Sequence, residues 1–319
     1  MILVTAANGN QGHLLIPKLV AGGLSVRASV QSEASAAALR AAGVDQVVVG
    51  DLADPDVLAR AIQGVEKVYH VGPTLSPSER AIGFAIIDAA RAEGVEHFVM
   101  SSVLHAITTD LVQHEVKRDI EEHLLSSGLE FTILQPTNYM LTHRLTPAFE
   151  RGVFELPWSL ERKQSLVDIG DIVEVAALVL GDTECHVGAT YELASPGRYT
   201  AYDLAAIISR VLDRPITAQE IDVDTFAKRM LGDADPSSKA YELRAMRAIS
   251  ARYSSNDFVG NPNVLTWLLG RTPTTFEDWV RAQCRRWRAT HPHVSVNVDE
   301  EIHHVTQGCS SRTDLGPQV

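Results

Sequence analysis

The chain has 319 residues, of which 45% are hydrophobic and 21% are charged, so it contains enough apolar material for a large core. A formal net charge of −12 disfavours non-specific binding to nucleic acid, which depends on basic surfaces. No apolar run approaches the roughly 20 residues that span a bilayer, and no secretory signal pattern opens the sequence. The three cysteines are far apart and indicate neither disulfides nor a metal site. We therefore expect a cytoplasmic protein without nucleic-acid or membrane partners.

The first 136 residues alternate short apolar runs with amphipathic segments. The apolar runs predict strands at residues 1–4, 25–30, 46–51, 67–72, 97–102 and 131–136. The amphipathic segments predict helices at residues 13–23, 34–43, 54–64, 79–94 and 114–128. Repeated strand–helix units with short connections predict a doubly wound parallel sheet with right-handed crossovers.

The pattern changes after residue 136. Residues 138–165 have a loop-like composition with scattered aromatic side chains, whereas residues 168–182 predict a helix that returns to the sheet. Strands and helices then continue to about residue 290, with strands expected at 190–195 and 215–222 and helices at 200–214 and 274–287. Two or three helices are expected after residue 222, and the last of them is the one at 274–287. The fold class is therefore α/β, a parallel Rossmann sheet with a smaller α+β C-terminal lobe.

The segment "TAANGNQG", residues 5–12, lies between the first expected strand and the first expected helix. Glycines at this place let the backbone turn sharply and approach a pyrophosphate, and the helix that follows offers free N–H groups. The G-x-G-x-x-G fingerprint would need a glycine at position 7, where the chain has Ala7. The alternative is a strand–helix turn that binds nothing.

The segment is similar to the T-G-x-x-G-x-x-G pattern of short-chain dehydrogenases, with Ala6 in place of the first glycine. It most resembles the atypical, NmrA-like branch of that superfamily. Further segments look like this branch, in the same order along the chain: "GDLADPDVL", "VYHVGPTLSPSE", "FVMSSVLHA", "HEVKRDIEEHLLSSGLEFTILQPTNYM", "LVDIGDIVEVAALVL" and "TTFEDWV". The resemblance implies an NAD(P)-binding Rossmann domain with an NADP or NAD cofactor.

The change of pattern after residue 136 also divides the chain. The NAD(P)-binding domain would contain residues 1–136 and about 163–182, and the substrate-binding lobe about 137–162 and 183–290. Residues 291–319 form a polar tail without a strong period. The cofactor contacts that the resemblance implies come from the opening loop, from the ends of the next strands and from one helix: Thr5, Ala6, Asn8, Gly9, Asn10, Gln11, Gly12, Gln31, Asp51, Leu52, Val71, Gly72, Pro73, Lys117 and Pro136.

The choice between NAD and NADP stays open. An acid at the end of the second strand usually marks NAD, and an arginine there marks NADP, but this strand ends in Gln31. Arg27 stands four residues earlier, where a structural role on the sheet is the better interpretation.

Short-chain dehydrogenases that reduce carbonyls use Ser, Tyr and Lys, with Tyr four residues before Lys and acting as proton donor. Lys117 is the candidate lysine, but Gln113 and Val103 stand at the other two positions. Lys117 would hold the nicotinamide ribose, or else pair with Glu121 one helical turn away. His114 would replace the tyrosine as donor, or else be a surface or capping residue.

The substrate cleft is expected to involve Ser102, His105, Asn138, Tyr139 and Trp158, although aromatic residues there also suit packing. The leading hypothesis is a reductase of a small carbonyl, quinone, imine or conjugated alkene. The resemblance leaves two alternatives open, an NAD(P)-sensing regulator without turnover and a non-redox isomerase or cyclase. The expected partner is a small-molecule substrate, and a homodimer is compatible with this family.

Overall fold

The computed structural model describes residues 1–44, 46–232 and 239–291. Its first half is a regular alternation of strands and helices. In chain order these are β1 (Ile2–Val4), α1 (Gly12–Ala21), β2 (Val26–Val30), α2 (Glu33–Ala41), β3 (Gln46–Val49), α3 (Pro55–Ile62), β4 (Lys67–Val71), α4 (Glu79–Ala92), β5 (His97–Ser101), α5 (Val112–Leu125) and β6 (Phe131–Pro136).

These six strands and β10 (Ala189–Leu193) form one parallel sheet in the order β10-β6-β5-β4-β1-β2-β3. The chain leaves β1 toward β2 and β3, and later returns to pair β4 with the other side of β1. This reversal creates a crevice at the carboxyl ends of β1 and β4, the usual ligand site of open α/β sheets.

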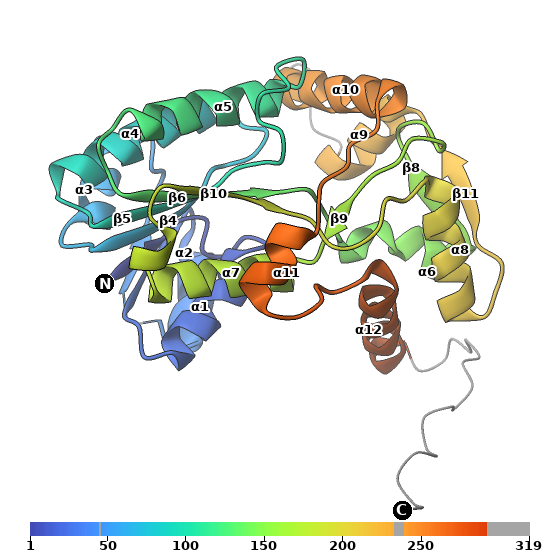
Figure 1. Ribbon diagram of the computed structural model, residues 1–319, viewed down its shortest axis with the longest axis horizontal. Coiled ribbons are helices and arrows are strands. Elements are labelled where there is room, and N and C mark those ends of the chain that lie inside the picture. The colour runs from blue at the N-terminus through green and yellow to red at the C-terminus, as the bar shows by residue number, and fades with distance from the viewer. Residues whose placement is uncertain (45, 233–238, 292–319) are drawn as a thin grey trace, which may run out of the picture.

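Helices cover both faces of the sheet, which explains why its strands are continuous apolar runs. The helices α3, α4 and α5 lie on one face, and α1, α2, α7 (Ile169–Gly181) and α11 (Asn263–Leu269) lie on the other (Figure 1). Each face has its own buried apolar cluster, one including Leu15 and Val173 and the other including Ile86 and Ile120.

A smaller lobe stands at one end of the sheet (Figure 1). Its elements are β7 (Asn138–Tyr139), the short 3-10 turn Thr142–Arg144, α6 (Thr146–Arg151), β8 (Val153–Leu156), β9 (Leu166–Val167), α8 (Ala201–Leu212), β11 (Thr217–Glu220), α9 (Val223–Leu231), α10 (Ala240–Ser255) and α12 (Phe276–Thr290). Two parallel strand pairs, β8–β11 and β7–β9, and a third apolar cluster rich in aromatic side chains hold it together.

The structure confirms the predicted Rossmann fold and corrects two details of the lobe. Residues 138–165 are not loop throughout, because they contain β7, α6 and β8. The expected lobe also gives two elements to the sheet domain: β10 pairs with β6, and α11 packs against α7 and β10. Of the predicted polar tail, residues 292–319 lie outside the described part of the chain.

Candidate functional site

A pocket of about 360 Å³ opens at the crevice between β1, β2 and β4. Five segments meet there: the loop after β1, the end of β2 with the start of α2, the turn after β3, the end of β4 and the start of α4. The lining residues are Thr5, Ala6, Asn8, Ser29, Val30, Gln31, Ser32, Ser35, Gly50, Asp51, Leu52, His70, Val71, Pro73 and Ile82. Eight of the predicted cofactor residues are among them.

The loop between β1 and α1 turns in the manner that its glycines suggested. Ala6 adopts a left-handed φ of 47°, and its carbonyl accepts a hydrogen bond from Gly9 N at 2.8 Å. A Cβ atom on Gly12 would lie only 2.5 Å from the carbonyl oxygen of Ala7, so no larger residue fits there. Because α1 begins at Gly12, its positive dipole end belongs to this loop.

The side chains of Thr5, Asn8 and Asn10 in this loop differ in their contacts. The Thr5 hydroxyl accepts from Val71 N at 2.8 Å and donates to Val71 O at 3.0 Å, which fastens β1 to β4. Asn8 Nδ2 donates to Ser35 Oγ at 3.0 Å, across the pocket entrance. Asn10 is exposed and does not line the pocket.

Gln11 was predicted as a cofactor contact, but its side chain is buried in the protein. Its Nε2 donates to Ser101 Oγ at 2.9 Å and to Tyr139 OH at 2.6 Å, and its Oε1 accepts from the Tyr69 hydroxyl. The amide therefore links the loop to β4, β5 and β7, and only the backbone of Gln11 is free for a ligand.

The outer part of the pocket carries polar groups without a cation. Gln31, Asp51 and Leu52 line it as predicted, and no described lining residue is Lys or Arg. Arg27 donates to the carbonyl oxygens of Ala61 at 3.0 Å and Gln63 at 2.6 Å, which supports its structural role.

The inner end of the crevice holds a buried ion pair. Lys117 Nζ lies 2.8 Å from Glu79 Oε1 and donates to Ser101 O at 3.2 Å, and the exposed fractions of the two side chains are 6% and 1%. A Cβ atom on Gly72 would lie 2.7 Å from Glu79 Oε1 and 3.2 Å from Lys117 Nζ. The end of β4 therefore runs directly beside the pair, and Gly72 leaves the space that the pair needs.

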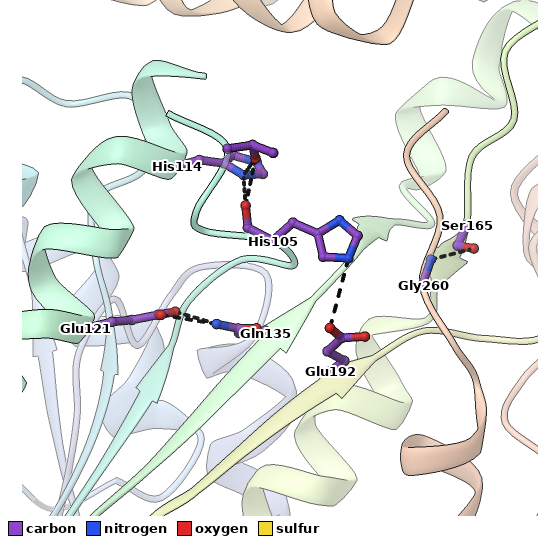
Figure 2. Close-up of polar contacts among 8 residues, drawn as sticks. His105, His114, Glu121, Gln135, Ser165, Glu192 and Gly260 are labelled. Carbon is purple, nitrogen blue, oxygen red and sulfur yellow. Dashed lines mark hydrogen bonds and ion pairs between the residues drawn. The ribbon is translucent and has the colours of Figure 1, made fainter. Parts of the chain in front are cut away.

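The alternative partner of Lys117, Glu121, is engaged elsewhere. Its carboxylate accepts from Gln135 Nε2 at 2.8 Å (Figure 2). Burial raises the pKa of Glu121, against the opposing effects of its hydrogen bonds and of the Lys117 charge.

His70 is a buried base on the pocket wall. Its Nδ1 lies 3.2 Å from Thr5 Oγ1, and its Nε2 has no hydrogen-bond partner among the described residues. Burial, with the nearby Lys117 charge as a second cause, lowers the pKa of His70 to about 3. The ring is therefore neutral near pH 7.

His114, the predicted proton donor, is buried at the start of α5. Its Nδ1 lies 3.0 Å from the His105 carbonyl and 2.9 Å from Thr108 Oγ1 (Figure 2). Because a carbonyl only accepts, the ring proton sits on Nδ1. Burial lowers the pKa of His114 to about 4. This arrangement supports a neutral residue that anchors the loop after β5.

The predicted substrate residues lie in different surroundings and do not share one set of contacts. Ser102 is buried and His105 points from a left-handed turn toward Glu192, 3.9 Å away (Figure 2). Tyr139 contacts Gln11 through its hydroxyl. Trp158 is 3% exposed within the aromatic cluster of the lobe, which supports packing.

Two further predicted cofactor residues, Pro136 and Gly9, are defined by their backbone contacts. Pro136, at the end of β6, accepts through its carbonyl from Leu104 N at 2.9 Å, so it fixes the loop that carries His105. Gly9 tolerates little, because a Cβ there would lie 3.0 Å from the Ala6 carbonyl oxygen.

Sequence reasoning missed Glu79 and His70. An acid in the first turn of a helix is typical of exposed helix starts, and a histidine inside an apolar strand is typical of a core position. Only the fold brings the start of α4 next to Lys117 of α5. Ser32 and Ser35 do carry a signal in the sequence, since a serine before a helical pattern predicts a cap, and Ser32 Oγ accepts from Ser35 N at 3.3 Å.

The described residues hold neither a membrane-crossing helix nor a metal cluster. No helix among them has the length and apolar character needed to cross a membrane. No group of three or more His, Cys, Asp or Glu side chains in the same residues is arranged to hold a metal ion.

Known proteins are similar to this chain over most of its length. It is 31% identical to an NAD(P)H azoreductase from Xenophilus azovorans, covering 91% of this chain and all of the relative. A solved structure of an NADPH-dependent quinone oxidoreductase from Escherichia coli, complexed with NADPH, is 28% identical, with a TM-score of 0.74 over 88% of this chain and 99% of the other. NmrA, a negative transcriptional regulator solved with NAD, is 18% identical, with a TM-score of 0.72 over 91% and 97%, and shares the fold alone.

The family model described as the NmrA-like family matches residues 1–280. This range includes the glycine-bearing loop, the whole parallel sheet and nearly all of the described lobe. The protein therefore belongs to the NmrA-like family.

Proposed function

We propose that this protein is an NAD(P)H-dependent reductase of a small quinone, carbonyl, imine, azo compound or conjugated alkene. The observation that carries the proposal is a pocket at the sheet's reversal point, with a buried lysine, Lys117, close to Gly72 in the segment that lines it. Relatives named azoreductase and quinone oxidoreductase, which match about nine-tenths of this chain, support the same chemistry.

The pocket fits a dinucleotide in its shape and its donors. The turn from Ala6 to Gly12 would hold the pyrophosphate through backbone N–H groups, and Gln31, Asp51 and Leu52 would hold the adenosine. Val71, Gly72 and Pro73 would run beside the nicotinamide ribose. Because Gln31 is uncharged, we expect little preference between NADH and NADPH.

The bound cofactor supplies the hydride, and this chain's residues position the reactants. The Lys117 ammonium has three N–H groups, of which one faces Glu79 and one donates to Ser101 O. The third is available for the ribose hydroxyls. Glu79 fixes the direction of the ammonium, and the buried surroundings exclude water from this end of the crevice.

The acceptor takes its proton from a source other than a tyrosine, because Gln113 stands at the tyrosine position. His114 holds its only proton toward the His105 carbonyl. Quinones and other conjugated acceptors can take a proton from water after hydride transfer, so the site suits them better than simple ketones.

The second candidate is a sensor that binds NAD(P) without turnover. The same observation favours it: among the described residues, the tyrosine position lacks an acid and His114 serves as a loop anchor. The third hypothesis, a non-redox isomerase or cyclase, has no observation of its own in its support.

The test replaces both members of the Lys117–Glu79 ion pair, so that no unpaired charge stays buried. The double variant Glu79→Gln/Lys117→Met should bind NADPH at least tenfold more weakly and reduce quinones more slowly by a larger factor. Lys67→Met is the matched control, because Lys67 Nζ donates to Leu180 O at the other end of β4. Isothermal titration and NADPH oxidation measure the two effects. Unchanged cofactor affinity in the double variant would contradict the assignment of Lys117.

The proposal retains a cytoplasmic location, a small-molecule substrate and a homodimer as expectations from the sequence. Size-exclusion chromatography with light scattering tests the homodimer.

A further inference from the structure

A small cavity in the lobe has a mostly apolar lining and contains two hydrogen-bond donors that have no acceptor among the described residues. Its volume is about 30 Å³, and its polar lining comes from Asn138, Arg144 and Gln164, with the Tyr139 ring beside them. Arg144 Nε and Gln164 Nε2 are both buried and have no hydrogen-bond partner among the described residues. Buried N–H groups without an acceptor are costly, so a pair of them in one cavity calls for an explanation.

A series of hydrogen bonds determines which atom of the Gln164 amide is left without a partner. The Tyr253 hydroxyl donates to Asn138 Oδ1 at 3.1 Å, and Asn138 Nδ2 donates to Gln164 Oε1 at 3.2 Å. With its oxygen already used as an acceptor, Gln164 presents only its NH₂ group to the cavity. This series of hydrogen bonds therefore ends in the NH₂ group of Gln164, which is a donor.

Arg144 adds a positive charge to the same cavity. Its guanidinium lies 5.3 Å from the centre of the Trp158 ring and 6.0 Å from that of Phe226. Burial lowers the pKa of Arg144, opposed by the nearby Tyr253. The two aromatic rings orient the guanidinium but do not accept its in-plane N–H groups, so the charge lacks an oxygen partner within the described residues.

The cavity size limits what can accept these bonds. A space of roughly 10–15 Å³ admits one water-sized group, so about 30 Å³ favours a compact acceptor such as a halide ion or a carboxylate. A cation among donors favours a negatively charged acceptor over a neutral one.

The cavity adjoins the proposed active site. Tyr139, on its wall, accepts a hydrogen bond from Gln11 of the loop before α1, and Asn138 and Tyr139 follow directly on β6. A substrate that extends from the inner end of the crevice into the lobe would bring a terminal group to this wall.

We propose that Arg144 and Gln164 form a binding site for a compact monovalent anion, either a free ion or the carboxylate of the substrate. The free-ion form stands independently of the proposed reductase activity, whereas the carboxylate form rests on it.

The first experiment uses bromide as the probe. Crystals of the wild-type protein soaked in sodium bromide should show an anomalous peak within hydrogen-bond distance of Arg144 Nε and Gln164 Nε2. The peak should be absent in Arg144→Met and Gln164→Leu and present in Arg151→Met, which removes an exposed cation of the same lobe that pairs with Glu155. A water molecule in the cavity and no bromide at any concentration, or a bromide peak that persists in both cavity variants, would overturn the proposal.

The second experiment separates the two sources of the anion. Michaelis constants for an unsubstituted naphthoquinone and for a carboxylate-bearing naphthoquinone are compared in wild type and Arg144→Met. A substrate carboxylate predicts at least tenfold tighter apparent binding of the charged quinone in wild type, equal constants in the variant, and competition by formate. The same ratio in both proteins together with bound bromide supports the free ion. If neither quinone is reduced, the carboxylate form is contradicted for quinone substrates, while the bromide result still decides the anion site.

Discussion

The two ends of the crevice are built on different physical principles. The outer end, near Gln31 and Asp51, is an open pocket of backbone and short side chains, and no described Lys or Arg lines it. The inner end contains a fully buried lysine–glutamate pair beside a neutral buried histidine. A substitution at the outer end can change the preference between NADH and NADPH with little loss of stability. At the inner end, the loss of either charge destabilises the fold.

The two ends also differ in the roles that we propose for them. The outer end would recognise the cofactor, and the inner end would position it for hydride transfer. Contacts from backbone N–H groups recognise a pyrophosphate whatever the rest of the dinucleotide carries. A charge held in a dry site fixes one orientation of the group that it contacts, which is what hydride transfer requires.

Glu79→Gln should have the largest effect on stability. It leaves the Lys117 ammonium buried without its counter-charge, and breaking a buried pair in this way costs about 3–5 kcal/mol. Urea unfolding measures the change in the free energy of unfolding. The double variant Glu79→Gln/Lys117→Met should recover most of the loss, and a double variant as unstable as the single one would show that the pair is not the cause.

Acid should destabilise the protein through its buried histidines. Burial lowers the pKa of His70 to about 3, and those of His97 and His114 to about 4. The unfolded chain binds protons near pH 6.5 while the folded chain resists them until about pH 4, so this stability is present above pH 6.5 and is lost as the pH falls toward 4.

Each of these histidines contributes up to about 1.4 kcal/mol per pH unit in that window. Denaturant unfolding at pH 7, 5.5 and 4 measures the slope of stability against pH. Replacing His114 by Gln should lower the slope of stability against pH by up to about 1.4 kcal/mol per pH unit, which corresponds to one proton. The carboxylates titrate alike in the two proteins, so the difference between their slopes reports His114. An unchanged slope would mean that His114 is accessible and titrates normally when folded.

Gln31→Arg should change cofactor preference at the outer end by about 1–2 kcal/mol in favour of NADPH, because a guanidinium can pair with the 2′-phosphate. Calorimetry with both cofactors should show tighter NADPH binding and unchanged NADH binding. Gln219→Arg, an exposed change on β11 of the lobe, is the control. Equal gains for the two cofactors would place Gln31 away from the ribose.

Ala6→Gly should give the smallest effect, a stabilisation of about 0.5–1 kcal/mol. Ala6 adopts a φ of 47°, and glycine accepts this left-handed conformation without the steric cost of a methyl group. Its neighbour Ala7 is fully buried, so Ala7→Gly should be destabilising. Thermal unfolding of the two variants measures this difference in sign.

The sheet domain could be predicted from the sequence because its signals are local. Apolar runs bounded by amphipathic helices specify a parallel sheet, and the loop of residues 5–12 has its strand and helix on either side. The place of β10 could not be predicted in this way, since the sequence of a short strand does not say which edge it joins. The elements within residues 138–165 could not be predicted because they are only two to six residues long, which is too short to display a clear helical or strand periodicity.

The site was predictable where it is made of loop backbone and not where it depends on contacts between distant helices. Gln31, Asp51 and Leu52 line the pocket because they follow strands whose ends meet there. The partner of Lys117 is 38 residues away on another helix, and nothing near Glu79 in the sequence marks it as buried. The free donors of Arg144 and Gln164 likewise exist only once the lobe is folded.

The most direct test of the central claim is NADPH oxidation by the wild-type protein with a panel of quinones, azo compounds, enones and imines, measured alongside the NADPH dissociation constant. A reductase predicts saturable oxidation with at least one acceptor class, one NADPH consumed for each acceptor reduced by two electrons, and loss of this activity in Glu79→Gln/Lys117→Met. Clear NADPH binding with no oxidation above the rate without enzyme, for every acceptor in the panel, would contradict the reductase and support the sensor.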